Sequence, residues 1–481
     1  MKQTNQKLLV LLIIITLLLV IDSIEGSKTN QAKMKTQKDV YNPKFHIFSD
    51  YISHTNIPRA NFTDTYNVTL FTNPDNADEV IFRYLKSAES SIFVSMYTIS
   101  RPEFNKTLID LKIANPSMDI QVLISYRRVG STENVDTEAA AQSLVDNGIP
   151  VYTSTKDDDK VDGFYHAKYW IIDGKHVFVY SGNWSPWSVT PQLVPPDDSY
   201  ASGEPNRDMG IAVHDAPEIA SFFKEEVWDE DVAVADEWTA STIKSKITQN
   251  SAFTPSFKIT GPNLYYPTFD ALNIKEEMTL SPMFTPDNAL EYHKWWIDRA
   301  NDTIEIQNPY ITQFDDNVAW SNDPSPVVRS LIDAKERGVS IRVQVNEDSD
   351  SDDVTAYFLS KGIEVKWMGN SQTSTNGWLS DTHNKIVIID GKVTLLSSIN
   401  FGENAFTNNR EAGMIIQSTT VADYYASILQ TDWVDGEIPP SSPYSEKSSS
   451  EESTGLYETP VFWSPIVLVL GLLPIIRRRS R

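Results

Sequence analysis

The stretches HAKYWIIDGKHVFVYSGN (166–183) and HNKIVIIDGKVTLLSSIN (383–400) carry one pattern twice. In each, a lysine follows a histidine by two positions, an aspartate follows the lysine by five, and a glycine comes next. The apolar residues on both sides of the Asp-Gly pair predict two strands joined by a hairpin turn. Side chains two apart on a strand share a face, so each histidine and its lysine are expected to point the same way. The pattern therefore selects four candidate catalytic residues: His166, Lys168, His383 and Lys385.

The repetition extends well beyond these two stretches. Matching segments lie roughly 210–220 residues apart, which is too long for a solenoid repeat; they pair 88–100 with 300–312, 119–125 with 340–346, and 147–151 with 361–365. Helical patterns separate the predicted strands, at 78–89, 103–113 and 136–147 in the first half and at 287–300, 326–337 and 353–362 in the second. Alternating strands and helices predict an α/β fold with two related halves, each containing a mixed sheet.

The two motifs resemble the signature of the phospholipase D superfamily, His-x-Lys-x4-Asp-x6-Gly-[Gly/Ser]-x-Asn, which that family carries twice. The resemblance spans about 75–435, and the residues after each aspartate continue it with Ser181, Asn183, Ser398 and Asn400. Tyr180 and Ser397 stand where the family has glycine, a departure that bears on the size of the substrate. The resemblance implies two pseudo-symmetric α/β/α sandwich halves with mixed sheets and a single active site at their interface.

This resemblance also implies a mechanism for phosphodiesters. Because the substrate is anionic, its oxygens are expected to bind the side chains of Lys168, Lys385, Asn183 and Asn400. One imidazole attacks phosphorus while the other protonates the leaving oxygen, and water then hydrolyses the phosphohistidine. The family resemblance alone assigns His166 as the nucleophile and His383 as the acid. Neither a metal nor a cofactor is expected.

Carboxylates are expected to support the site. The family has an acidic residue after each motif, and NRDMG (206–210) and NREAG (409–413) resemble that segment. Asp208 and Glu411 are therefore expected to orient the imidazoles and fix their tautomer. Asp173 and Asp390 lie at the hairpin turns, where a side chain orients backbone or lysine rather than substrate. A proline-rich insertion between Thr190 and Pro205 is expected to form a mobile wall of the cleft.

Composition excludes several other classes of protein. The 481 residues include no cysteine, which rules out disulfides, a thiolate nucleophile and Cys-ligated metals. The formal charge of −24 opposes long-range attraction of polyanions and argues against tight non-specific binding of duplex nucleic acid.

Apolar segments flank the predicted body. Residues 1–26 are typical of a signal peptide, with an uncleaved signal anchor as the alternative. The apolar run 461–476 ends in an arginine cluster, as in a stop-transfer helix with a short cytoplasmic tail, and it also resembles prokaryotic sorting tails. Both interpretations place an exported protein on the outer face of the cell membrane, held by a single-pass anchor near its C-terminus. The predicted order is signal peptide 1–26, polar lead-in 27–74, first half 75–235, connector 236–282, second half 283–438, Ser/Glu/Pro-rich stalk 439–459, and transmembrane or sorting tail 460–481.

These observations leave three functions open. A phosphodiester hydrolase acting on phospholipids is favoured by the membrane anchor, the acidic body and the aromatic residues Trp184 and Trp187. A single-stranded nucleic-acid exonuclease would use the same chemistry, with the same aromatic residues stacking on bases. If these tryptophans are plain core residues, they favour neither substrate. An inactive cell-surface binding module is the third, and the intact His, Lys and Asn residues of both halves argue against it. No obligate protein partner is implied, because one chain carries both motifs.

Overall fold

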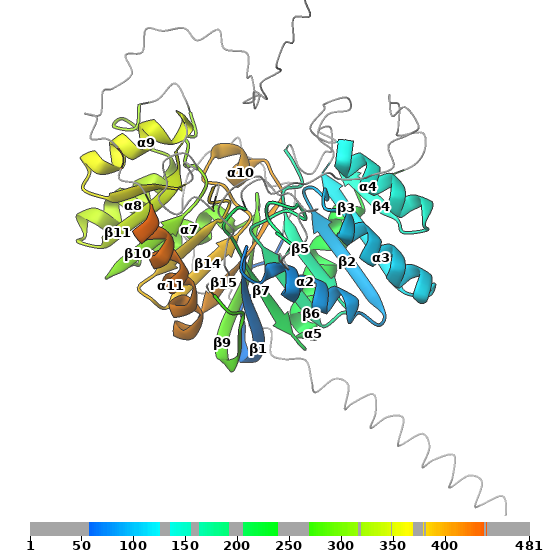
Figure 1. The fold of residues 1–481 in the computed structure, drawn as a ribbon. Helices are drawn as coiled ribbons and strands as arrows, with labels where there is room; N and C mark the ends of the chain where they lie inside the picture. Colours follow the sequence, from blue (N-terminus) through cyan, green and yellow to red (C-terminus); the bar gives the residue numbers. More distant parts are fainter. Residues whose placement is uncertain are drawn as a thin grey trace, which may run out of the picture. The chain divides into compact units, whose positions relative to one another are not determined.

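The structure, a computed structural model, describes residues 57–125, 135–154, 163–191, 205–238, 269–315, 319–347, 349–368, 379, 381–436 and 439. Within these ranges the chain repeats one order of elements in two halves (Figure 1). The predicted signal peptide and C-terminal tail lie outside the described residues. No helix among the residues that are described is both long and apolar enough to cross a membrane.

The first half, from residue 62 to residue 237, begins with a long strand and then alternates helices and strands. Its elements are β1 (Phe62–Asn73), α2 (Ala77–Lys86), β2 (Ser91–Met96), α3 (Pro102–Ala114), β3 (Asp119–Ser125), α4 (Val135–Asp146), β4 (Val151–Ser154), β5 (Lys168–Ile172), β6 (His176–Tyr180), β7 (Asp208–His214), α5 (Pro217–Ser221), the π-helical turn η2 (Phe222–Trp228), α6 (Asp229–Val232) and β8 (Asp236–Glu237).

The second half repeats this order from residue 272 to residue 435. Its elements are β9 (Leu272–Thr285), α7 (Ala289–Ile297), β10 (Thr303–Gln307), α8 (Pro326–Glu336), β11 (Ser340–Asn346), α9 (Ser349–Ser360), β12 (Glu364–Met368), β13 (Ile386–Ile389), β14 (Val393–Ser397), α10 (Glu403–Thr407), β15 (Glu411–Gln417) and α11 (Thr419–Asp435).

One mixed sheet runs through both halves, with the strand order β12-β11-β10-β13-β14-β15-β9-β1-β7-β6-β5-β2-β3-β4-β8. Strands β2, β3 and β4 pair in parallel, as do β10, β11 and β12, whereas the remaining neighbours are antiparallel. The halves join where β1 pairs with β9, so the order is mirrored about that pair. The predicted two-half α/β fold with mixed sheets is therefore confirmed, and its two sheets are continuous. The segments predicted as lead-in and connector contain β1 and the start of β9.

Three apolar cores hold the elements together. One lies between the first half's strands and helices α2, α3 and α4, and a second lies between the second half's strands and α7, α8 and α9. The third core draws side chains from both halves, including Tyr169, Phe284, Leu396 and Tyr425. Burial of apolar surface by both halves together stabilises their contact, which is the contact that a shared active site requires.

Candidate active site

Each motif forms a hairpin with an Asp-Gly turn. Asp173 and Gly174 have φ angles of 53° and 60°, and Asp390 and Gly391 have φ angles of 52° and 58°. Two successive residues with positive φ give the type I′ turn, which Asp-Gly sequences favour. The strands are shorter than the sequence suggests, because β5 begins at Lys168 and β13 at Ile386. The two histidines therefore lie just before their strands.

The turn aspartates bind backbone amides of a neighbouring strand. The carboxylate of Asp173 accepts hydrogen bonds from the amides of Glu89, Ser90 and Ser91, at 2.7–3.1 Å. That of Asp390 accepts from the amides of residues 301, 302 and 303, at 2.8–3.1 Å. Burial would raise the pKa of each carboxyl group, but these amides lower it below its ordinary value. Each turn is thereby fixed to the start of β2 or β10.

Each histidine binds a carboxylate from the opposite half. His166 Nδ1 lies 2.9 Å and 2.7 Å from the two carboxylate oxygens of Glu411. His383 Nδ1 lies 3.0 Å from Asp208 Oδ1. The sequence predicted both carboxylates as imidazole partners, and the structure adds that the pairs are exchanged between the halves. A neutral imidazole that donates from Nδ1 to a carboxylate keeps its lone pair on Nε2, the nitrogen that can attack.

Short backbone bridges bring about this exchange. The His166 amide donates to the carbonyl oxygen of Arg410, at 2.8 Å, and the Arg410 amide donates to that of Phe164, at 2.9 Å. In the same way, the His383 amide donates to the carbonyl oxygen of Arg207, at 2.9 Å. Glu411 and Asp208 are the residues after these two arginines, so each carboxylate is placed beside the histidine of the other half.

Neighbouring polar side chains hold the two carboxylates. Ser181 Oγ donates to Asp208 Oδ1 at 2.7 Å, and Ser398 Oγ donates to Glu411 Oε2 at 2.6 Å. Asn409 Nδ2 also donates to Glu411 Oε1, at 3.1 Å. Burial would raise the pKa of each carboxyl group, but the partner histidine, a nearby lysine and the serine donor lower it below its ordinary value. Both groups are thus anionic beside their imidazoles.

The two lysines are buried and electrostatically coupled across the halves. Lys168 is 0% exposed and Lys385 1% exposed. The Lys168 ammonium donates to the carbonyl oxygen of His166 at 2.6 Å, and that of Lys385 donates to the carbonyl oxygen of His383 at 2.5 Å. Burial lowers the pKa of Lys385 to about 8, and burial together with the Lys385 charge lowers that of Lys168 well below its ordinary value.

The imidazoles also respond to charges from both halves. Burial, together with the charges of Lys168 and Lys385, lowers the pKa of His166 to about 4, against the raising effect of Glu411. Burial and both lysines likewise lower the pKa of His383. The lysine of the opposite half therefore lowers the pKa of each imidazole, as expected if the two half-sites converge.

The remaining predicted site residues, Asn183 and Asn400, follow strands β6 and β14. The side-chain oxygen of each is buried, and among the described residues it has no hydrogen-bond partner. Because buried amide groups are normally paired, this leaves one polar atom of each side chain to be satisfied by a ligand or by water.

The two departures from the family signature are both buried. The Tyr180 ring stacks on Phe71, with ring centroids 5.5 Å apart, and its hydroxyl donates to the carbonyl oxygen of Ser188. It therefore fills the core beneath α2, α3 and α4. Ser397 is 1% exposed and its hydroxyl accepts a hydrogen bond from the amide of Ile399, at 3.1 Å. Both side chains stabilise the loops that lead to the asparagines.

The two tryptophans named from the sequence differ in exposure. Trp184 is 0% exposed and stacks on Phe104, with ring centroids 4.2 Å apart, so it is a core residue that cannot contact a substrate. Trp187 is 41% exposed. Of the two interpretations that the sequence left open, Trp184 therefore follows the one in which it is a core residue and supports neither substrate.

Sequence reasoning missed other residues that contact the site. The Tyr97 ring lies edge-on to His166, with centroids 4.6 Å apart, and the Lys168 ammonium lies 5.4 Å from its centre. Arg207 and Arg410 lie inside the repeated Asn-Arg-Asp and Asn-Arg-Glu sequences, and that repetition was the signal that could have identified them. Among the described residues, no group of three or more His, Asp or Glu side chains is arranged to hold a metal ion.

Comparison with known proteins identifies a family for both halves. The family model described as "Cardiolipin synthase, PLD-like domain" matches residues 81–228 and 295–433, one segment in each half. No curated protein sequence matches the chain.

Among solved structures, the fold is similar to phosphatidylserine synthase from Haemophilus influenzae Rd KW20, with 13% identity, a TM-score of 0.53, and coverage of 78% of this chain and 90% of that one. The phospholipase D family member Nuc from Salmonella typhimurium matches over 34% of this chain and 99% of its own, with 21% identity and a TM-score of 0.29. The two family matches together cover more than half of the sequence, and each includes one histidine–lysine motif. The chain therefore belongs to the phospholipase D superfamily of phosphodiesterases and phosphotransferases.

Proposed function

We propose that the protein hydrolyses phosphodiesters through a phosphohistidine intermediate and that its substrates are phospholipids. The observation that carries the proposal is the pair of exchanged contacts, His166 with Glu411 and His383 with Asp208. These contacts hold two imidazoles with Nε2 free to react, beside two buried ammonium groups that neutralise the charge of a phosphodiester.

In this proposal His166 is the nucleophile and His383 is the acid. The His166 side chain is 12% exposed, its pKa is lowered to about 4, and a neutral imidazole is the form that attacks. The His383 side chain is 24% exposed, and a bound phosphodiester anion raises the pKa of a nearby imidazole, so it can carry the proton to the leaving oxygen. Water then attacks the phosphohistidine, and His383 takes the proton from that water.

The favoured substrate is a phospholipid because the acidic chain opposes binding of polyanions, with a formal charge of −24. The matching family model carries the name of a cardiolipin synthase, and cardiolipin is itself a phospholipid. The second candidate is a single-stranded nucleic acid. Tyr97, beside His166, offers an aromatic surface that a base can stack on.

The test offers the full-length protein two substrates in the presence of a chelator: phospholipid vesicles of defined headgroup and a single-stranded oligonucleotide. We expect release of the headgroup, and loss of that release in His166→Ala and His383→Ala. His176→Gln is the matched control, because this histidine lies at the start of β6, where it packs against His214. Cleavage of the oligonucleotide alone would show that the substrate is a nucleic acid and not a phospholipid. Activity that appears only with added metal would overturn the mechanism.

We also propose that the enzyme acts at the outer face of the cell membrane, attached through the apolar segment 461–476. The support is its sequence: an apolar run followed by an arginine cluster. Treatment of intact cells with protease should remove the body of the protein. Protection of the body in intact cells, with digestion only after lysis, would contradict this location.

A further inference from the structure

Two buried arginines, Arg207 and Arg410, hold matching positions in the two halves, and neither is used in the chemistry above. Both are 0% exposed. The guanidinium of Arg207 lies 2.7 Å from the carboxylate of Asp75 and 3.0 Å from that of Asp432. The guanidinium of Arg410 lies 2.7 Å from Asp287 and 3.0 Å from Asp231. Each arginine thus binds one carboxylate of its own half and one of the opposite half.

The backbone of each arginine touches both members of a histidine–carboxylate pair. The Arg410 carbonyl oxygen accepts from the amide of His166, and the next residue in the chain is Glu411, the carboxylate that binds His166. The Arg207 carbonyl oxygen accepts from the amide of His383, and the next residue is Asp208, which binds His383. One residue therefore fixes a histidine from one half and its carboxylate from the other.

We propose that Arg207 and Arg410 are positioning residues, each of which sets the geometry of the one histidine–carboxylate pair that it adjoins. An Arg fork binds two carboxylates in fixed directions, whereas a lysine is a point charge without that geometry. Displacement of a catalytic group by about 1 Å can lower a rate by about 100-fold. The two arginines therefore link closure of the halves to alignment of the imidazoles. The inference deepens the proposed function and rests on it for its kinetic test.

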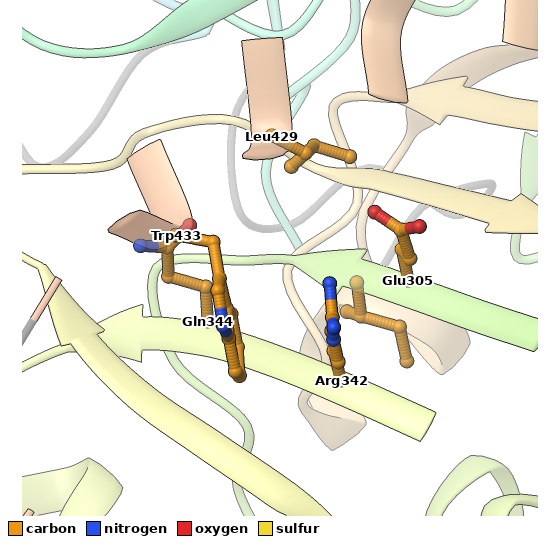
Figure 2. A pocket seen from close by; sticks show the side chains of 6 residues that line it. Glu305, Arg342, Gln344, Leu429 and Trp433 are labelled. Atoms are coloured by element: carbon orange, nitrogen blue, oxygen red, sulfur yellow. The ribbon is translucent and has the colours of Figure 1, made fainter. Parts of the chain in front are cut away.

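The opposite-half partner of Arg207 is itself firmly placed. Asp432 lies on α11, and its carboxylate also accepts from Gln307 Nε2 at 3.0 Å. Figure 2 shows the packing beside it, where Leu429 and Trp433 of α11 lie over the side chains of β10 and β11. There Gln344 Nε2 donates to the backbone oxygen of Asp432 at 2.8 Å, and the Arg342 guanidinium lies 5.4 Å from the centre of the Trp433 ring. This packing holds the carboxylate where Arg207 needs it.

The kinetic test is a pair of double-mutant cycles on a simple phosphodiester such as bis(p-nitrophenyl) phosphate. Arg410→Lys should lower kcat by about 10- to 100-fold with little change in KM. In a Glu411→Gln background, Arg410→Lys should lower kcat by less than about threefold, because the pair that Arg410 positions is already broken. In an Asp208→Asn background, the two losses in kcat should multiply. Arg207→Lys should show the opposite pattern. Equal multiplication in both backgrounds would overturn the proposal.

Two controls separate positioning from folding. Arg101→Lys changes a buried arginine that binds Asp78 and Glu103, two carboxylates of its own half, so kcat per folded molecule should stay unchanged. Should Arg410→Lys fail to fold, Asp287→Asn weakens the same cluster more mildly and takes its place in the cycles. A fall in kcat in Arg101→Lys equal to that in the test variants would overturn the proposal.

A measurement that needs no turnover separates this inference from the proposed function. In protein with isotope-labelled histidine rings, NMR should show Arg410→Lys shifting the His166 signal and leaving the His383 signal in place, with the reverse in Arg207→Lys. If the wild-type protein cleaves no phosphodiester while these selective shifts appear, the proposed function fails and the positioning role stands. Shifts of both signals in each variant, or of neither, would overturn the positioning role.

Discussion

The two half-sites contain the same residue types in different surroundings. The His166 side chain is 12% exposed, contacts both oxygens of Glu411, and has the Tyr97 ring against it. The His383 side chain is 24% exposed and contacts one oxygen of Asp208. A repeated motif thus reproduces the reactive groups, while the residues around it make one imidazole more enclosed than the other.

Specific substitutions between the halves produce this difference. Glu411 is one methylene longer than Asp208, so it reaches its histidine with both oxygens and also binds Ser398 and Asn409. Asp208 Oδ2 is buried, and within the part of the chain that the structure describes it has no partner. Pro309 stands in the second half where Tyr97 stands in the first, when the repeated segments are aligned. In the proposed mechanism, the more enclosed His166 acts as the neutral nucleophile, and the more exposed His383 as the acid that must gain and lose protons.

The largest expected effect comes from removing either imidazole. His166→Ala and His383→Ala should each lower turnover by more than about 1,000-fold, because the proposed mechanism requires both attack and protonation. A radiolabelled diester with a good leaving group should still form a phosphohistidine in His383→Ala, since such a group departs without a proton. The label should be absent in His166→Ala. Label on His383 of the wild-type protein would reverse the assignment of the two roles.

A smaller effect is expected from the carboxylates. Glu411→Gln and Asp208→Asn should each lower kcat by about 10- to 100-fold, the range found when a carboxylate that orients a metal-bound histidine is replaced. The loss should be greater for Glu411, which makes two contacts with its histidine where Asp208 makes one. Steady-state kinetics of the two variants side by side measure the difference. Equal losses would show that the second contact adds nothing to the first half-site.

The pH dependence of kcat/KM tests Lys385, and the expected change is about tenfold per pH unit. Lys385 has a pKa lowered to about 8, so its ammonium is charged below that pH and is lost as the pH rises through it. Because kcat/KM reports the free enzyme, it should decline above pH about 8, to about one tenth at one unit higher. A permanently charged side chain in Lys385→Arg should remove this alkaline decline, even at a lower overall rate. A decline that persists in Lys385→Arg would assign it to another group.

Much of this site was visible in the sequence because its parts are local. Strands β3 and β11 have the predicted bounds, and both hairpins turn at their Asp-Gly pairs. Periodicity and turn chemistry fix such features over a few residues. The same is true of the repeat, since like sequences fold into like elements.

The exchange of carboxylates between the halves could not be predicted in this way. Asp208 and His383 are 175 residues apart, and their contact depends on how two complete halves close together. The arginine clusters could not be predicted for the same reason, because Arg410 meets Asp231 only after α6 is packed against the opposite half. The role of Trp184 stayed open for a related reason: sequence proximity to Asn183 says nothing about the direction of a side chain, and the ring points into the core.

The smallest expected effect concerns the turn aspartates, where the two halves are most alike. Asp173→Asn and Asp390→Asn should each destabilise the protein by about 1–3 kcal/mol, because an amide oxygen replaces a carboxylate that accepts three backbone amides. Asparagine tolerates positive φ, so the change removes hydrogen bonding without straining the turn. The two losses should be similar, because each carboxylate also has a side-chain partner: the Ser90 hydroxyl at 2.8 Å for Asp173, and Asn301 for Asp390. Urea denaturation measures both free energies of unfolding.

Acid provides the matching check on these two carboxylates. Their pKa values are lowered in the folded protein, so the stability that they contribute is present above the unfolded pKa of about 3.9 and is lost as the pH falls through the lower folded values. Each asparagine variant should therefore lose less stability between pH 5 and pH 3 than the wild-type protein. If the wild type and both variants lose stability in parallel, the turn carboxylates do not anchor β2 and β10 through their charge. The likeness of the two hairpins would then lie in backbone shape alone.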